Sequence, residues 1–434
     1  MRFPALFLIL ASLALARAPI HYREANPAYH VVTEFQTGVM SVLAGVGTST
    51  STSATGPIFT GTQSNQLTFG AVTVTYLLTL PTPVNVCADS FVSVVYHVAN
   101  KTRALNMSAA VVALGNNILN YKAYEFGGVN IKDTNISRPG YWQRANLTKR
   151  KFSTTGTFTC SAVDTLVMTM ASAAATSDTI TIGGVYTYAS KGPATLIITA
   201  DDAFAGWLRL GATYMASKGL KHTAFINGNT LGAAPFGDVR LLDSLYAMGY
   251  MEIGSHMWRH DTIPLVTIDS AYKLVKLNYD FIRGHGWKGY NLAAMPYGAR
   301  SLAQDSMFRA SGMMDFNRSI VSNTEGEPQN FANPYAIKIH FILNNGSTLA
   351  AMKSRLDSIV VAQTTGVVLV HDLCTACALT STLWLSSDFQ AFIDYALTYV
   401  QAGTLKIQNL GDYVEKYGGG FSRRHRAGVA AAGP

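Results

Sequence analysis

Four short groups of residues in the second half of the sequence combine carboxylates, imidazoles and a tight turn. They are Asp201-Asp202, His256-x-x-x-His260, Pro296-Tyr297-Gly298 and His371-Asp372. Two histidines four residues apart can reach one metal ion from a single turn of chain, and a carboxylate from another segment completes a His₂Asp set. Because such a set leaves coordination positions open, the pattern predicts a catalytic rather than a structural metal site.

The remaining acid and the last histidine predict acid–base chemistry around that site. One carboxylate of the Asp201-Asp202 pair can bind the ion while the other acts as a base on water. His371 follows the apolar run Gly366–Val370 and can give a proton to an amide or ester leaving group. Each group alone is more often a turn, a cap or a core residue, so the prediction depends on their combination.

Strand-like and helix-like segments alternate after residue 190. The expected strands are Ala194–Ala200, His222–Asn227, Met251–Gly254, Leu292–Ala294, Val367–Val370 and Leu405–Gln408. The expected helices lie near 207–215, 239–248, 268–283 (capped by Thr267 or Asp269 and closed by Gly284), 301–309, 348–362 and 389–400. This order predicts βα units around a parallel sheet, either a barrel or a doubly wound sheet. In both folds the carboxyl ends of the strands carry the chemistry, and each of the four groups follows an expected strand.

With these motifs, residues 193–417 resemble the polysaccharide deacetylase family with the NodB-homology domain, carbohydrate esterase family 4. The resemblance implies an α/β fold, a distorted (β/α) barrel, and Zn²⁺ or another divalent transition metal such as Co²⁺. It implies an acetylated polysaccharide as substrate, such as chitin, peptidoglycan or xylan, which loses N-acetyl or O-acetyl groups. The implied roles are base for Asp201, metal ligand for Asp202, His256 and His260, oxyanion contact through the backbone N–H for Tyr297, and general acid for His371.

Some neighbours of these residues depart from the pattern of the family. They are Ala200 for the usual Phe, Ala203 for a frequent Gly, and Met257 for Ser or Thr. Ala294 stands where the family has the Arg that orients the catalytic base, and Arg300 and Arg318 are candidate substitutes. Asp315 is the one candidate remnant of an acidic fourth motif. These departures leave an alternative open, namely a catalytically impaired homologue that acts as a glycan-binding protein.

Residues 17–190 predict an all-β, sandwich-like domain that precedes the catalytic domain at 191–417. Strand-like runs rich in Val, Thr and Tyr occur at Leu67–Leu80, Phe91–Val98, Leu166–Met170 and Thr179–Tyr186. The Ser/Thr/Gly-rich stretch Gly45–Ser64 predicts a mobile loop or linker. The domain is expected to bind glycan or to act as a spacer. Candidate sugar-stacking residues are Tyr121, Tyr124, Phe126, Tyr141 and Trp142.

The N-terminus predicts a secretory signal peptide, residues 1–16, and hence an extracellular protein. Arg2 precedes the apolar run Leu6–Leu15, and Ala14-Leu15-Ala16 is a small-residue cleavage site. Cleavage after Ala18 and an uncleaved anchor remain alternatives. No later segment has 18 uninterrupted apolar residues, so no stable membrane insertion is expected.

Secretion makes the four cysteines candidates for two disulfides, Cys87–Cys160 and Cys374–Cys377. A zinc or redox site at Cys374-x-x-Cys377 is the alternative. N-glycosylation sequons begin at Asn100, Asn106, Asn135, Asn146, Asn317 and Asn345.

Composition limits the remaining function classes. The 434 residues are 48% hydrophobic and 13% charged, which allows two or three domains with large cores, followed by a flexible tail at 418–434. The net charge of +8 is spread thinly, and its short clusters lack the interleaved aromatics of a nucleic-acid site. A weakly basic surface suits anionic glycans better than nucleic acid. The sequence does not indicate an oligomeric state.

Overall fold

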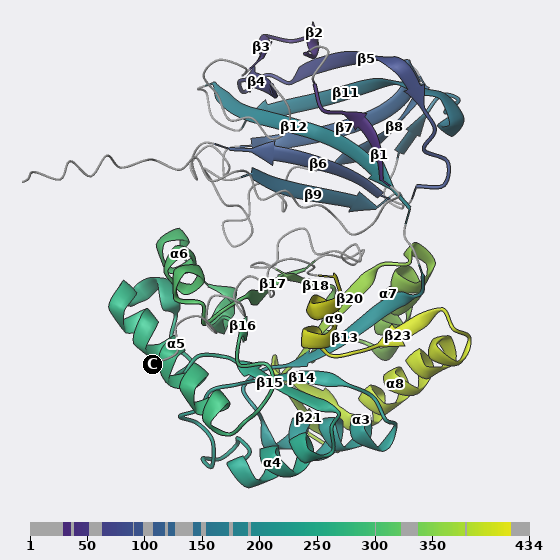
Figure 1. Ribbon diagram of the computed structural model, residues 1–434. Coiled ribbons are helices and arrows are strands. Elements are labelled where there is room, and N and C mark those ends of the chain that lie inside the picture. Colours follow the sequence, from purple (N-terminus) through teal and green to yellow (C-terminus); the bar gives the residue numbers. More distant parts are fainter. Residues whose placement is uncertain are drawn as a thin grey trace, which may run out of the picture.

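The computed structural model contains two antiparallel sheets before residue 190 and a strand barrel surrounded by helices after it (Figure 1). It describes residues 29–35, 39–51, 63–89, 91–98, 107–117, 120–125, 142–148, 153–172, 177–189, 192–299, 301–322, 337–377 and 380–417. The predicted signal peptide and C-terminal tail lie outside the described residues, as do Arg300, Phe126 and Tyr141.

The first half is a β-sandwich, as predicted. One sheet has the order β3 (Gly47–Ser51), β4 (Asn65–Phe69), β12 (Asp178–Tyr188), β6 (Phe91–His97) and β9 (Trp142–Thr148), with β1 (Tyr29–Thr33) also on β12. The other has the order β10 (Ser153–Thr155), β8 (Asn120–Glu125), β7 (Met107–Asn117), β11 (Val163–Ser172), β5 (Val74–Val84) and β2 (Ser41–Ala44). Alternate side chains of both sheets meet in one apolar core, which includes Leu67, Val94, Val112 and Leu166.

Two expectations for the sandwich need correction. The stretch Gly45–Ser64 is not a loop throughout, because strand β3 pairs with β4 along its whole length. The Thr and Ser residues of β3 are compatible with a short edge strand, where one side of the backbone has no neighbouring strand. The run Leu67–Leu80 is two strands, since Gly70 and the turn after it separate β4 from β5. The predicted disulfide Cys87–Cys160 is present.

The second half is a nearly closed parallel barrel, which selects the first of the two predicted sheet types. Its order is β18 (Ile337–Ile339), β17 (Phe316–Ser322), β16 (Leu292–Ala294), β15 (Met251–Ser255), β14 (His222–Ile226), β13 (Ala194–Ala200), β20 (Thr365–Val370) and β19 (Phe341–Leu343). Only His340 separates β18 from β19, so one segment of chain connects the two edges of the sheet. Strand β23 (Leu405–Ile407) pairs with the first residues of β13, and β14 pairs only with the last two residues of β13. This split pairing along β13 distorts the barrel.

Helices lie outside the strands and bury their apolar faces against them (Figure 1). They are η3 (Trp207–Ala212, π-helical) with α3 (Thr213–Ser217), α4 (Val239–Ala247), α5 (Ile268–Gly284), α6 (Leu302–Ser311), α7 (Leu349–Ala362), α8 (Ser386–Gln401) and α9 (Leu410–Tyr417). Of the two candidate caps of α5, Thr267 accepts the N–H of Ser270. The left-handed glycine after this helix is Gly286 rather than Gly284. No helix among the described residues is long and apolar enough to span a membrane.

Glu252 is a buried carboxylate that attaches α9 to the amino-terminal end of the barrel, away from the four motifs. It is 4% exposed, and its Oε2 accepts the backbone N–H of Gly411 and the hydroxyl of Thr223. The hydroxyl of Thr223 in turn accepts the N–H of Leu410. Burial raises the pKa of Glu252 to about 7, although these hydrogen bonds act in the opposite direction.

Glu252→Gln is expected to stabilise the protein above pH 7. The folded state retains the Glu252 proton where the unfolded state has lost it, so stability should fall as the pH rises from about 4.5 to 7. A glutamine oxygen at the position of Oε2 keeps both hydrogen bonds without this cost, which is on the order of 3 kcal/mol. Denaturant unfolding at pH 5 and pH 8 measures the difference, with the exposed Asp280→Asn as control. Parallel pH profiles for Glu252→Gln and the unmodified protein would contradict it.

Candidate metal centre and active site

Strand alternation brings the reactive side chains to the inside of the barrel mouth. Ile197 and Leu369 point into the barrel, where they pack with Phe225 and Phe316. Because side chains alternate along a strand, positions 201 and 371 point to the same interior at the carboxyl ends of β13 and β20. The apolar strand residues therefore determine where Asp201 and His371 lie.

The three predicted metal ligands come together at the ends of β13 and β15. One ligand atom from each of Asp202, His256 and His260 lies within 4.8 Å of the others. The Oδ1 of Asp202 is 3.5 Å from Nε2 of His256 and 3.6 Å from Nε2 of His260. Within the described part of the chain, no other group of three such residues has this spacing.

Backbone contacts orient the imidazole of His256. Its Nδ1 is 2.6 Å from the carbonyl oxygen of Ala294, and a carbonyl can only accept. Nδ1 must therefore carry the proton, which leaves the Nε2 lone pair directed toward Asp202. The side-chain amide of Asn227 donates to the carbonyl oxygens of His256 and Met257 and supports the turn.

The electrostatics of this cluster fit a divalent cation. Burial lowers the pKa of His256 to about 4 and also lowers the pKa of His260, so both imidazoles are neutral near pH 7. Burial and the neighbouring Asp201 raise the pKa of Asp202 to about 7. The two neutral imidazoles offer lone pairs that a Zn²⁺ or Co²⁺ ion would bind. The two neighbouring carboxylates carry excess negative charge that the same ion would compensate.

Left-handed backbone conformations are concentrated at this site. Six described non-glycine residues have positive φ, and four of them lie in the motifs or directly beside one: Asp202, Ala203, Met257 and Tyr297. Such residues cost free energy and persist where the surrounding structure requires them, often in active sites. The positive φ at position 203 also explains why glycine suits this position in the family.

Asp201, the predicted base, is paired with Arg318. The Nη2 of Arg318 contacts both carboxylate oxygens, and the two side chains are buried. Burial tends to raise the pKa of Asp201, but Arg318, with smaller contributions from His256 and His371, lowers it below its ordinary value. Of the two candidate substitutes for the family Arg, Arg318 therefore reaches the base. Asp315, just before the start of β17, instead accepts a hydrogen bond from Asn291.

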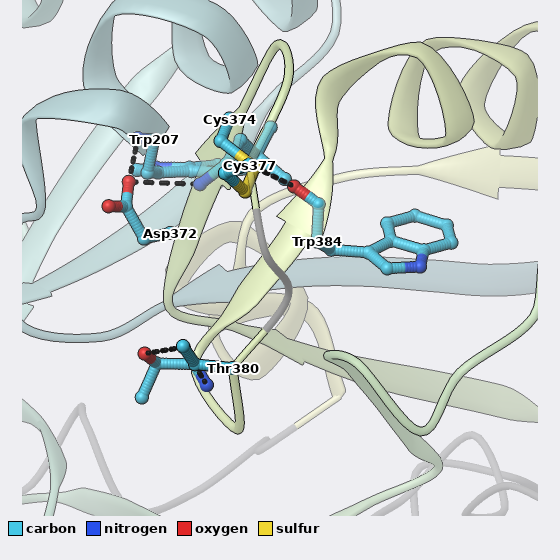
Figure 2. The surroundings of a disulfide bond; sticks show 8 residues. Trp207, Asp372, Cys374, Cys377, Thr380 and Trp384 are labelled. Atoms are coloured by element: carbon cyan, nitrogen blue, oxygen red, sulfur yellow. Dashed lines mark hydrogen bonds between the residues drawn. A yellow bond between two sulfur atoms is a disulfide. The ribbon is translucent and has the colours of Figure 1, made fainter.

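The segment around His371 is attached to η3 and to a disulfide. The Oδ1 of Asp372 accepts the backbone N–H of Trp207 at 2.7 Å and of Leu373 at 2.9 Å (Figure 2). The predicted disulfide Cys374–Cys377 follows directly, in the loop after β21 (Asp372–Cys374), which pairs with β22 (Leu383–Leu385). Burial lowers the pKa of His371, and Asp201 acts in the opposite direction. The Nδ1 of His371 is buried, with no partner among the described residues.

Tyr297 lies beside His260 of the candidate metal centre and has an exposed side chain. The residue is 58% exposed, and its ring packs edge-on against His260, with the ring centres 4.6 Å apart. The Oδ1 of Asn317 accepts the N–H of Met295 and ties β17 to the start of this turn. Gly298 has a positive φ, and a Cβ there would lie 2.6 Å from Ile320. The backbone role predicted for Tyr297 stays a prediction.

Several supporting residues carried no signal in the sequence. Asn278 donates to Ile226 and Ser255 and accepts from Gly228, so it links α5 to two strand ends of the site. Asn227 was likewise not anticipated, because buried asparagines inside a helix or after a strand have no distinctive spacing. The sequon at Asn317 is unsuited to a glycan, since this residue is 1% exposed.

A parallel barrel with a candidate His₂Asp metal centre at its mouth has the groups that metal-assisted hydrolysis requires. Residues 189–314 match the family model described as polysaccharide deacetylase. This range includes three of the four motifs and ends before Arg318 and His371. The resemblance that the motifs predicted is thereby confirmed.

Three solved structures are similar to about half of this chain. A family 4 carbohydrate esterase from Streptomyces lividans is 18% identical and covers 50% of this chain and 93% of its own, with a TM-score of 0.34. The chitin deacetylase from the fungal pathogen Colletotrichum lindemuthianum is 12% identical, with coverages of 52% and 88% and a TM-score of 0.37. The Xyl-CE4 domain of a xylanase from the hindgut metagenome of Trinervitermes trinervoides is 12% identical, with coverages of 52% and 92% and a TM-score of 0.36. No curated protein matches the chain.

Proposed function

We propose that the protein is a secreted, metal-dependent polysaccharide deacetylase that hydrolyses N-acetyl or O-acetyl groups of a carbohydrate polymer such as chitin, peptidoglycan or xylan. The observation that carries the proposal is the cluster of Asp202, His256 and His260 beside the buried pair of Asp201 and Arg318. The family match over residues 189–314 supports the same class of reaction.

In the proposed reaction, each side chain has one step. When bound, a zinc or cobalt ion would polarise the acetyl carbonyl and acidify a water molecule. Asp201, held by Arg318, accepts the proton of the attacking water. His371 donates a proton to the nitrogen or oxygen of the sugar as acetate leaves. The backbone N–H of Tyr297 donates a hydrogen bond to the carbonyl oxygen as its negative charge develops.

The alternative of an impaired, glycan-binding homologue was motivated by Ala294. Arg318 provides a guanidinium at Asp201 from the neighbouring strand, which removes the main reason for this alternative. A glycan-binding role for the sandwich stays a prediction. Of its candidate aromatics, Tyr121 and Tyr124 lie on β8 and Trp142 on β9.

Protein loaded with zinc or cobalt is expected to release acetate from chitin oligomers, acetylxylan or peptidoglycan. Protein stripped with a chelator should release none until metal is restored, because the carbonyl is then not polarised. Quantifying free acetate across the three substrates measures both the activity and the substrate class. A folded, metal-loaded protein that binds one of these glycans yet releases no acetate would support the binding alternative instead.

A further inference from the structure

Residues 294 and 318 occupy equivalent places on neighbouring strands. Strands β16 and β17 are parallel, and Ala294 is the register partner of Arg318. Side chains of paired residues in adjacent strands project from the same face of a sheet. That face is the interior of the barrel, where Ala294 packs with Phe225 and Phe316. An arginine on either strand can therefore project toward the same interior region.

The contacts of Arg318 are those of a positioned group. The side chain is fully buried and contacts both carboxylate oxygens of Asp201 through Nη2. Its Nη1 donates to the carbonyl oxygen of Ser319 at 3.3 Å, and its guanidinium lies over the ring of Phe225, 5.5 Å from the ring centre. Contacts on three sides restrict the rotation of the guanidinium, which in turn restricts the Asp201 carboxylate.

The short side chain of Ala294 complements this arrangement. Ala294 is completely buried, and its carbonyl oxygen accepts from His256. The backbone of this residue thus supports a metal ligand, while its methyl group leaves interior volume for the side chain from the next strand. A second arginine at position 294 would place two buried cations at one carboxylate, which is unfavourable.

We infer that Arg318 is the positioning residue for Asp201 in this protein, and that positions 294 and 318 form an exchangeable pair in which one residue is Arg and the other is small. This inference rests on the proposed deacetylase function and adds a residue beyond the matched family region. Arg318 acts through Asp201 and does not itself touch the acetyl group.

Moving the arginine between the strands tests the inference. Arg318→Ala is expected to lower kcat about 10- to 100-fold with metal content unchanged and KM altered less than about threefold. Adding Ala294→Arg to Arg318→Ala should restore most of the lost kcat. Adding Ala294→Lys should restore much less, because an ammonium that contacts the carboxylate has no second nitrogen and no planar group to fix its orientation, as Nη1 and the ring of Phe225 fix the guanidinium of Arg318. Arg355→Ala is the matched control, since Arg355 donates to His340 outside the site and its loss should leave kcat unchanged.

A purely structural role would give different results. If the double variant regains thermal stability but not kcat, Arg318 is only a buried ion-pair partner and the inference is overturned. If Arg318→Ala does not fold, the kcat of the double variant is compared with the kcat of Arg318→Lys. A folded double variant with the higher kcat supports the inference. A higher kcat for Arg318→Lys overturns it. If the unmodified protein releases acetate and the Arg318→Ala variant releases it at the same rate, this inference alone is overturned. Absence of release by the unmodified, metal-loaded protein overturns the proposed function and this inference together.

Discussion

Asparagine in place of Asp201 is expected to lower acetate release about 10²–10⁴-fold while the metal stays bound. The amide has nearly the size and polarity of the carboxylate but cannot accept the proton of the attacking water. Asp201 is not part of the Asp202–His256–His260 cluster, so the metal content of the variant should match that of the unmodified protein. Turnover and elemental analysis on the same preparation measure both properties.

Asp202→Asn is the matched comparison because it makes the same chemical change one residue further along. It should weaken metal binding, since it removes the carboxylate from the ligand set, and excess zinc should partly restore activity. Equal loss of metal in the two variants would show that the assigned division of labour is incorrect. So would full activity of Asp201→Asn.

Alanine in place of His256 is expected to abolish metal retention and the stabilisation that accompanies it. A metal that binds only the folded state at about 1,000 times its Kd adds about 4 kcal/mol to the free energy of unfolding. The variant lacks the lone pair that the Ala294 carbonyl directs toward Asp202, so zinc should leave its thermal midpoint unchanged. Thermal unfolding with and without zinc, together with the metal content, tests this.

His285→Ala is the control for this experiment. His285 stacks on Trp287 at the end of α5 and is not part of the metal cluster, so its variant should keep one ion per chain and the full zinc response. Full metal occupancy in His256→Ala would contradict the assignment of the ligands.

The strands that end in motifs were predicted well, but three other strands of the barrel were not. Strand β17 and the segment Ile337–Leu343 have no counterpart among the predicted elements. β17 carries Asn317 and Arg318 on adjacent positions, and both are buried. Polar residues inside a strand interrupt the apolar run by which a buried parallel strand is recognised. The buried Arg318 is therefore both the residue that connects β17 to Asp201 and a reason why β17 was not recognised as a strand.

The sequence by itself determined the local chemistry of this protein. The candidate metal ligands, base and acid each follow an apolar strand-like run, so sequence spacing alone placed them together at the carboxyl ends of a parallel sheet. Only the tertiary structure decided which arginine supports Asp201. Arg318 is 117 residues from its partner and meets it because β17 lies beside β16 in the sheet. Strand pairing determines such long-range contacts, and no local periodicity encodes them, since the pairing depends on how the whole barrel buries its apolar faces.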